Sequence, residues 1–183
     1  MEYKEIQFKL KDGHTAIFKS PTKEMAKEML AFVRQASGET DFLMRYPEEY
    51  DDYTIEKEEE FISGATDNPD ACMIMCFIDG KIAGNCQITF SSGIKDGHRA
   101  SVAIGILQEF WGIGIGTRMF EEMIRLAKER GTTRQIELDF VEGNTRARAL
   151  YEKMGFRITG IKPDAVRFKD GRFVNKYMMV KVL

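Results

Sequence analysis

Apolar and polar residues alternate along two short runs near the start of the chain, residues 4–10 and 15–19, on either side of Asp12-Gly13. A period of two predicts strands, and an Asp-Gly pair between two such runs predicts a tight hairpin. From residue 25 to residue 33 the apolar spacing changes to that of a helix, which we expect to end near Gly38. The chain therefore begins as a hairpin followed by a helix.

The rest of the chain changes repeatedly between the two kinds of spacing. After a loop over residues 39–53 we expect a helix at 54–64, strands at 71–78, 81–91 and 99–107, an amphipathic helix at 117–130, a strand at 136–141, a helix at 145–154, and strands at 156–160 and 173–181. If the helix at 117–130 is a crossover, the strands before and after it are parallel. This order predicts a mixed sheet with helices on both faces, α+β in character.

Length and charge limit the classes of function. The chain has 183 residues without repeat or linker, so we expect one domain over residues 1–183. The 27 Lys and Arg nearly balance the 29 Asp and Glu, which argues against binding of nucleic acid. The longest apolar stretch, residues 71–78, is too short for a membrane span, and no signal peptide is visible. We expect a cytoplasmic protein.

Three cysteines, Cys72, Cys76 and Cys86, lie inside strand-like runs. An odd number without a signal peptide indicates reduced, buried thiols. Four-residue spacing between the first two could suggest metal ligands, but on a strand it mostly indicates two small apolar residues on one face. We therefore expect no metal site.

The most informative segment is a glycine-rich turn, Trp111-Gly112-Ile113-Gly114-Ile115-Gly116-Thr117, which leads into the helix at 117–130. Such a turn presents backbone N–H groups at the positive end of a helix dipole, where phosphate binds. A P-loop would need Lys and Ser or Thr after the last glycine, and Thr117-Arg118 follows instead. A dinucleotide-binding turn would need G-x-G-x-x-G directly after its strand. Glycines that only allow close packing are a third interpretation.

A second pattern decides between these interpretations. Asn144, Ala147, Arg148 and Tyr151 fall on one helix face, ahead of Gly155-Phe156. Together with the turn, the segment Asn144 to Phe156 resembles the GNAT superfamily of acetyl-CoA-dependent N-acetyltransferases. One residue departs from that family's pattern, because Trp111 stands where Gln or Arg is usual.

The resemblance implies the acyl-CoA N-acyltransferase fold, in which a largely antiparallel sheet contains one splayed parallel strand pair. It implies acetyl-CoA as cosubstrate, with the pantetheine arm along the strand at 104–107, Asn144 bonded to that arm, and Tyr151 as the general acid for the departing thiolate. The residues expected to bind the cosubstrate are Ile104, Ile106, Leu107, Trp111, Gly112, Ile113, Gly114, Ile115, Gly116, Thr117, Asn144, Ala147 and Tyr151.

The acceptor side is less specified. The resemblance implies a small-molecule or peptide amine and an acidic general base, for which Glu137 or Asp139 is the candidate, with Glu142 and Glu39 as further ones. Residues 39–60 hold ten acidic side chains, so a cationic acceptor such as a polyamine, an aminoglycoside or a peptide amine is favoured. A homodimer is a candidate assembly. The alternatives are a CoA-binding sensor without turnover and, less favoured, a dinucleotide-binding oxidoreductase.

Overall fold

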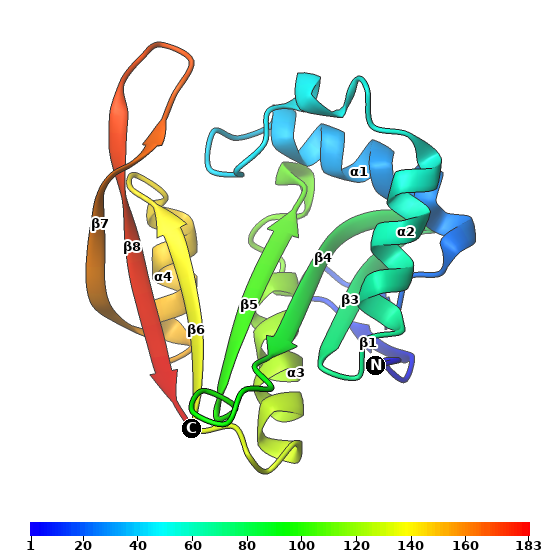
Figure 1. The fold of residues 1–183 in the computed structure, drawn as a ribbon. Helices are drawn as coiled ribbons and strands as arrows, with labels where there is room; N and C mark the ends of the chain where they lie inside the picture. The colour runs from blue at the N-terminus through cyan, green and yellow to red at the C-terminus, as the bar shows by residue number, and fades with distance from the viewer. The chain divides into compact units, whose positions relative to one another are not determined.

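A computed structural model describes all 183 residues of the chain (Figure 1). Its strands are β1 Ile6–Lys9, β2 Thr15–Lys19, β3 Ala71–Ile78, β4 Lys81–Phe90, β5 Arg99–Ile106, β6 Gln135–Val141, β7 Arg157–Arg167 and β8 Phe173–Val182. Its α-helices are α1 Ala26–Gly38, α2 Ile55–Thr66, α3 Ile115–Glu129 and α4 Thr145–Lys153. The strands follow one another in the sheet in the order β1-β2-β3-β4-β5-β6-β8-β7.

The strand pairing confirms the predicted fold class, a mixed and largely antiparallel α+β sheet. Strands β5 and β6 are parallel, whereas β1–β2, β2–β3, β3–β4, β6–β8 and β7–β8 are antiparallel. The parallel pairing is short, because it joins only Arg99, Ala100 and Ser101 to Gln135, Ile136 and Glu137. A dinucleotide-binding fold would need a mostly parallel sheet, so the oxidoreductase alternative lacks its scaffold.

The contacts within the chain divide it into two compact units. The first unit consists of Met1–Thr89 and Ala103–Met119, and the second of Phe90–Val102 and Phe120–Leu183. Their charges differ in sign: the first unit carries 11 Lys and Arg against 19 Asp and Glu, and the second 16 against 10. The single domain over residues 1–183 stays a prediction.

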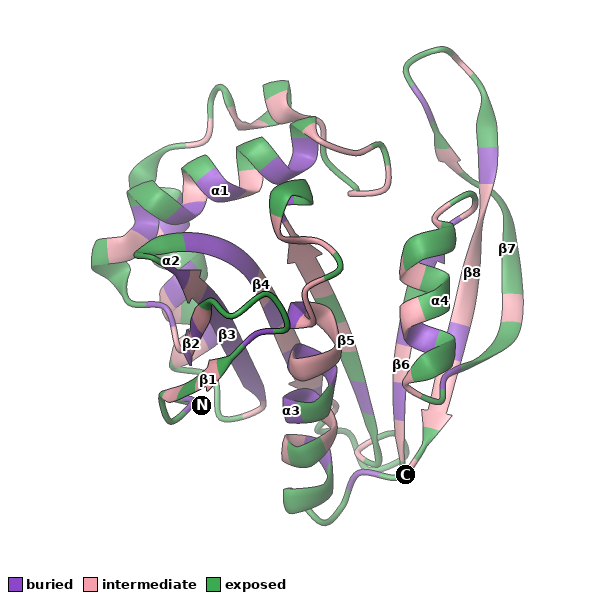
Figure 2. Cartoon of the chain, turned by 180° about the vertical axis from the view of Figure 1, so that it is seen from behind, coloured by how far each residue is buried: buried purple, intermediate pink, exposed green.

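The first unit is built on β1–β4, with α1 and α2 packed on a buried apolar cluster. Helix α1 contributes Met29 and Phe32 to that cluster, α2 contributes Ile62, and β3 contributes Met73 and Met75. Figure 2 shows buried and exposed positions alternating along α1. The prediction of two helices after the first hairpin is confirmed, and Thr54 caps α2 by accepting a hydrogen bond from the Lys57 amide at 3.3 Å.

The second unit packs α4 and the later part of α3 against β6 and β8 through aromatic side chains. The Phe120 ring lies 5.4 Å from Tyr151 and 5.6 Å from Phe156, both edge-on. The Phe140 ring of β6 lies 5.9 Å from Tyr151 and is stacked on Tyr177 at 5.3 Å. These rings fix the orientation of α4, and with it the face that carries the second motif.

Two predicted boundaries were wrong in an informative way. Helix α3 begins at Ile115, so the last glycine of the turn lies inside the first helical turn. Strand β7 reaches Arg167, well past the predicted end at residue 160. It ends the strand order and pairs with β8 alone, so Pro163 removes no ladder hydrogen bond. Register shifts between Ile158 and Gly160 and before Val166 absorb the irregular residues.

The three cysteines are buried thiols outside any disulfide, as predicted. Burial raises the pKa of the Cys76 thiol to about 12, so this thiol stays protonated and unreactive at neutral pH. None of the helices combines the length and the apolar character that crossing a membrane requires.

Candidate functional site

The glycine turn lies in the first unit, and its backbone has the conformation that only glycine adopts easily. Gly112 has φ of 84° and Gly114 has φ of 108°, both in the left-handed region. The Arg118 amide donates to the Gly114 carbonyl at 3.1 Å and closes the first turn of α3. The amides of Ile115, Gly116 and Thr117 therefore precede the helical ladder, at the positive end of the dipole. The start of α3 thus has the backbone geometry typical of anion-binding helix starts.

The side chains around the turn hold it in place. Ile115 is buried, with 1% of its surface exposed, and anchors the start of α3 in the core. The indole Nε1 of Trp111 donates to the Ile106 carbonyl at 2.7 Å and so ties the turn to the end of β5. The residue that departs from the family pattern thus fastens the turn. Because an indole carries no charge, Trp111 supplies no cation for a phosphate.

A residue that sequence reasoning missed also lies at the turn. The Lys11 amide donates to the Ile113 carbonyl at 3.3 Å. The Lys11 side chain lies beside Gly114, with Cγ 3.8 Å and Cε 3.9 Å from the point where a Cβ on that glycine would stand. No sequence signal could have identified it, because about a hundred residues separate the hairpin from the turn.

The predicted pantetheine strand is the end of β5. Leu107 is buried in the apolar cluster, and its amide donates to the Ala83 carbonyl at 3.0 Å. The Ile106 carbonyl is occupied by Trp111, so two of the backbone groups in this segment are already paired within the protein. Gly84 lies so close to the backbone of Gly105 that only a glycine fits at position 84. A Cβ there would stand 2.8 Å from the Gly105 carbonyl oxygen.

The second motif lies in the second unit, on α4. Asn144 caps the helix, since its Oδ1 accepts a hydrogen bond from the Ala147 amide at 3.2 Å. One lone pair of its Oδ1 is therefore engaged locally, and its side-chain NH2 group is the donor that can meet a ligand. One turn after Ala147, Tyr151 is 8% exposed and packed among Phe120, Phe140 and Phe156.

The environment of Tyr151 keeps its hydroxyl protonated. Burial, with a smaller contribution from the charge of Asp139, raises the pKa of Tyr151 to about 12. The raised pKa favours the neutral phenol in the folded chain. The corresponding stability is present below the ordinary pKa of 10 and is lost as the pH rises through about 12. At neutral pH the group is a proton donor, never a phenolate.

The two base candidates on β6 differ in how they are engaged. Glu137 forms a two-point ion pair with Arg99 and accepts a hydrogen bond from the Gln135 side chain at 2.7 Å. The Arg99 hydrogen bond holds the pKa of Glu137 below its ordinary value of 4.5. Its stabilising effect is present above pH 4.5 and is lost as the pH falls through the lowered pKa. A carboxylate so held is a weak base.

Asp139 is paired with a single cation. Its Oδ2 lies 2.7 Å from the Lys176 Nζ, and about a third of its side chain is exposed. Its negative charge contributes to the raised pKa of Tyr151, so the acid candidate and this carboxylate interact electrostatically. The other two candidates are occupied. Glu39 accepts from the Gln108 amide at 2.7 Å, and Glu142 from the Asn175 amide at 3.2 Å and the Tyr177 hydroxyl at 3.3 Å.

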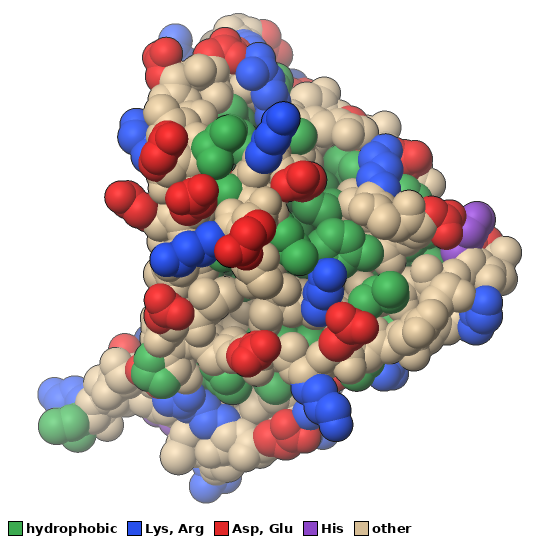
Figure 3. All heavy atoms as spheres, turned by 90° about the vertical axis from the view of Figure 1, so that its right-hand side faces the viewer, with side chains coloured by type: hydrophobic (Ala, Val, Ile, Leu, Met, Phe, Trp, Pro, Cys, Tyr) green, Lys and Arg blue, Asp and Glu red, His purple; other side chains and the backbone are tan.

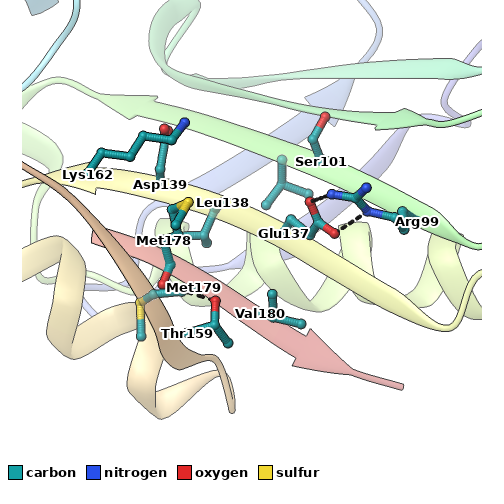
Figure 4. A pocket seen from close by; sticks show the side chains of 11 residues that line it. Arg99, Ser101, Glu137, Leu138, Asp139, Thr159, Lys162, Met178, Met179 and Val180 are labelled. Atoms are coloured by element: carbon teal, nitrogen blue, oxygen red, sulfur yellow. Dashed lines mark hydrogen bonds and ion pairs between the residues drawn. The ribbon is translucent and has the colours of Figure 1, made fainter. Parts of the chain in front are cut away.

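Both carboxylates line a cavity of about 410 Å³ in the second unit (Figure 4). Side chains alternate along a strand, so Glu137 and Asp139 lie on the face of β6 opposite Phe140, and hence opposite α4. The floor is apolar, with Met178 and Val180 of β8, and Arg99, Ser101 and Lys162 complete its polar wall. The volume suits a small molecule or a short peptide segment.

Comparison with known proteins agrees with the two motifs. The model of the acetyltransferase (GNAT) family matches residues 36–156. An N-alpha-acetyltransferase of Sulfurisphaera tokodaii is 26% identical over 98 residues, a match that covers 48% of this chain and 58% of that protein. The chain thus spans little more than half the length of this relative.

Solved structures share the fold over most of the chain. A GNAT-family acetyltransferase from Streptococcus pneumoniae has 28% identity and a TM-score of 0.84, with 92% of this chain and 99% of that chain covered. The yncA protein of Salmonella typhimurium, solved with its cofactor acetyl-CoA, has 14% identity and a TM-score of 0.76, with 92% and 94% covered. Since the family model covers both the glycine turn and the Asn144–Phe156 motif, the chain belongs to the acetyltransferase (GNAT) family.

Proposed function

We propose that the protein transfers the acetyl group of acetyl-CoA to a primary amine by direct attack of the amine on the thioester. The observation that carries the proposal is the local structure of the two family motifs. One is a turn with two left-handed glycines at the start of α3, and the other is a capped α4 that carries a buried, protonated Tyr151. A turn of this kind binds pyrophosphate through backbone amides.

The acid step follows from the state of Tyr151. When the amine attacks, the thioester carbonyl becomes an oxyanion, and its collapse expels the CoA thiolate. The neutral phenol donates its proton or a hydrogen bond to that sulfur. The aromatic packing around the ring fixes the position of the phenolic oxygen, which is the condition for a positioned acid. The oxyanion would be stabilised by a backbone amide, for which the end of β5 near Ile106 is our candidate.

The base step falls to Asp139 rather than Glu137. A primary ammonium has a pKa near 10.4, so it must lose a proton before it can attack. Asp139 is electrostatically coupled to Tyr151 and is held by a single contact, the ion pair with Lys176. Glu137 is held by Arg99 and Gln135 and has a lowered pKa. We propose that the amine proton leaves to Asp139, directly or through water.

We expect Asp139→Asn to lower kcat/KM for the amine about 100-fold, on the scale of a lost general base. The matched change Glu137→Gln removes a largely surface ion pair and should alter kcat/KM less than about threefold. The pH profile of kcat/KM from pH 5 to pH 10 separates the two roles. If Glu137→Gln lowers kcat/KM more than Asp139→Asn does, and also flattens the pH profile of kcat/KM, the assignment of the base to Asp139 is wrong.

The class of acceptor rests on charge. Of the acidic residues in segment 39–60, Glu39, Glu49, Asp51 and Glu58 are engaged or buried inside the chain, and Asp41, Asp52, Glu56 and Glu60 are exposed. Figure 3, which faces the side with α2, shows acidic and basic side chains interspersed around an apolar patch. The exposed carboxylates support a cationic acceptor, from the polyamine, aminoglycoside or peptide-amine class.

The test is a panel of amines assayed with acetyl-CoA, with release of the CoA thiol as readout and mass spectrometry of the acetylated product as confirmation. The proposal expects acetyl-CoA-dependent product with at least one cationic primary amine. Tight binding of CoA without acetylation of any amine would favour the alternative of a CoA-binding sensor. Loss of CoA binding altogether would contradict both.

A further inference from the structure

We propose that Lys11 is the cation that binds the pyrophosphate of acetyl-CoA at the glycine turn. The proposal rests on the proposed function, which puts the pyrophosphate on the amides of this turn. It adds a residue that neither family motif contains and that lies on a different element, the hairpin between β1 and β2. Lys11 would supply positive charge at a turn where Trp111 carries none.

The fold brings this hairpin to the turn by direct contact. The backbone of Lys11 is hydrogen-bonded to Ile113, at 3.3 Å between amide nitrogen and carbonyl oxygen. The aliphatic part of its side chain passes along Gly114, 3.8 Å to 3.9 Å from the site of a Cβ. The methylene groups of Lys11 therefore lie beside Gly114, whose backbone is in the left-handed region. The ammonium at the end of that stem can reach a group held on the adjacent amides.

The ammonium of Lys11 is available for a ligand. Lys11 is exposed, and its Nζ has no hydrogen bond or ion pair within the chain. Lys9, two residues earlier on the same hairpin, is committed, because its Nζ donates to the Thr15 hydroxyl at 2.7 Å and to the Gly13 carbonyl at 3.5 Å. Arg118, the other cation near the turn, has its guanidinium over the Phe8 ring at 5.4 Å.

The first unit has an excess of negative charge, which disfavours the binding of a pyrophosphate unless a cation lies close to it. The unit carries 11 basic against 19 acidic side chains, so a pyrophosphate approaches a surface of its own sign. Trp111 at the turn carries no charge, and its indole nitrogen donates to the Ile106 carbonyl. Backbone amides supply partial charges only. Lys11 adds a full positive charge at the turn itself.

The experiment is isothermal titration of the full chain with CoA and with 3′-dephospho-CoA, which has the pyrophosphate but lacks the 3′-phosphate. The variants are Lys11→Met, Lys11→Arg and the matched control Lys9→Met. We expect Lys11→Met to weaken both ligands about tenfold, the scale of one charge-assisted contact at a partly exposed site. Lys11→Arg should keep most of the affinity, and Lys9→Met should leave it unchanged. Affinity should also depend less on salt in Lys11→Met.

Several outcomes would overturn the inference. Equal affinities of Lys11→Met and the parent would leave Lys11 without a role. Equal losses in the two methionine variants would indicate a general field and not a specific contact. A loss confined to CoA would assign Lys11 to the 3′-phosphate instead. In each of these cases the parent still binds CoA, so the proposed function survives, whereas a parent that binds neither ligand would refute the proposed function itself.

Discussion

Gly114→Val is expected to weaken the binding of CoA about 100-fold while the chain remains folded. Gly114 has φ of 108°, a conformation that a β-branched residue does not adopt without strain. The Cβ itself would meet only ordinary contacts with Lys11, so the damage comes from the backbone and not from a clash. To relieve the strain the turn must rotate its peptides, and the amides of Ile115 to Thr117 then no longer converge. Titration with CoA measures the loss.

The matched control is Gly131→Val, just beyond the end of α3. Gly131 has φ of 74° and open space around its Cβ position, so valine imposes the same kind of backbone strain there. Both variants should lose similar thermal stability, but only Gly114→Val should lose CoA affinity. Equal affinities in the two variants would show that the glycine turn is not the phosphate site.

Tyr151→Phe is expected to lower kcat about 100-fold with little change in the KM for acetyl-CoA. The change removes the proton donor, and a positioned acid contributes about this much. It keeps the ring, so the packing against Phe120, Phe140 and Phe156 is preserved. Because the pKa of Tyr151 is raised to about 12, the parent should show no fall in rate from ionisation of this phenol until the pH approaches that value.

Tyr177→Phe is the control for this change. Tyr177 belongs to the same aromatic cluster, stacked on Phe140, and its hydroxyl donates to Glu142. Its loss should alter kcat by less than about threefold, since the hydrogen bond is only partly buried. Equal kcat values in Tyr151→Phe and the parent would show that Tyr151 only packs in the aromatic cluster and is not the acid. Equal losses in both variants would point to disturbed packing of the cluster.

Local chemistry made much of the fold predictable. The Asp-Gly hairpins and the Thr54 and Asn144 caps each depend on residues close together in sequence. The length of β7 was not predictable in this way. Pro163 is compatible with a strand only because β7 pairs on one side, and that depends on its place in the sheet.

In the candidate site, too, the features set by residues close together in sequence were predictable and those set by distant residues were not. The glycine turn and the Asn144–Tyr151 face are short-range patterns, so the sequence identifies them. Lys11 reaches the turn only through the pairing of a distant hairpin. Glu137 looks like a base until the fold pairs it with Arg99, which lies 38 residues away along the chain. Whether a carboxylate can act as a base depends on the charged groups that contact it. Groups on a neighbouring strand can be far away in the sequence, so local sequence patterns do not predict them.

The most direct test of the account is a set of initial rates with acetyl-CoA and an accepted amine varied together. Direct attack requires both substrates to be bound before any product leaves, so the reciprocal plots should intersect, and no acetylated protein should accumulate when the amine is omitted. Parallel plots with a covalent acetyl-protein would contradict direct attack. Absence of acetylated amine, in a protein that still binds CoA, would contradict the claim that this chain is an acetyltransferase.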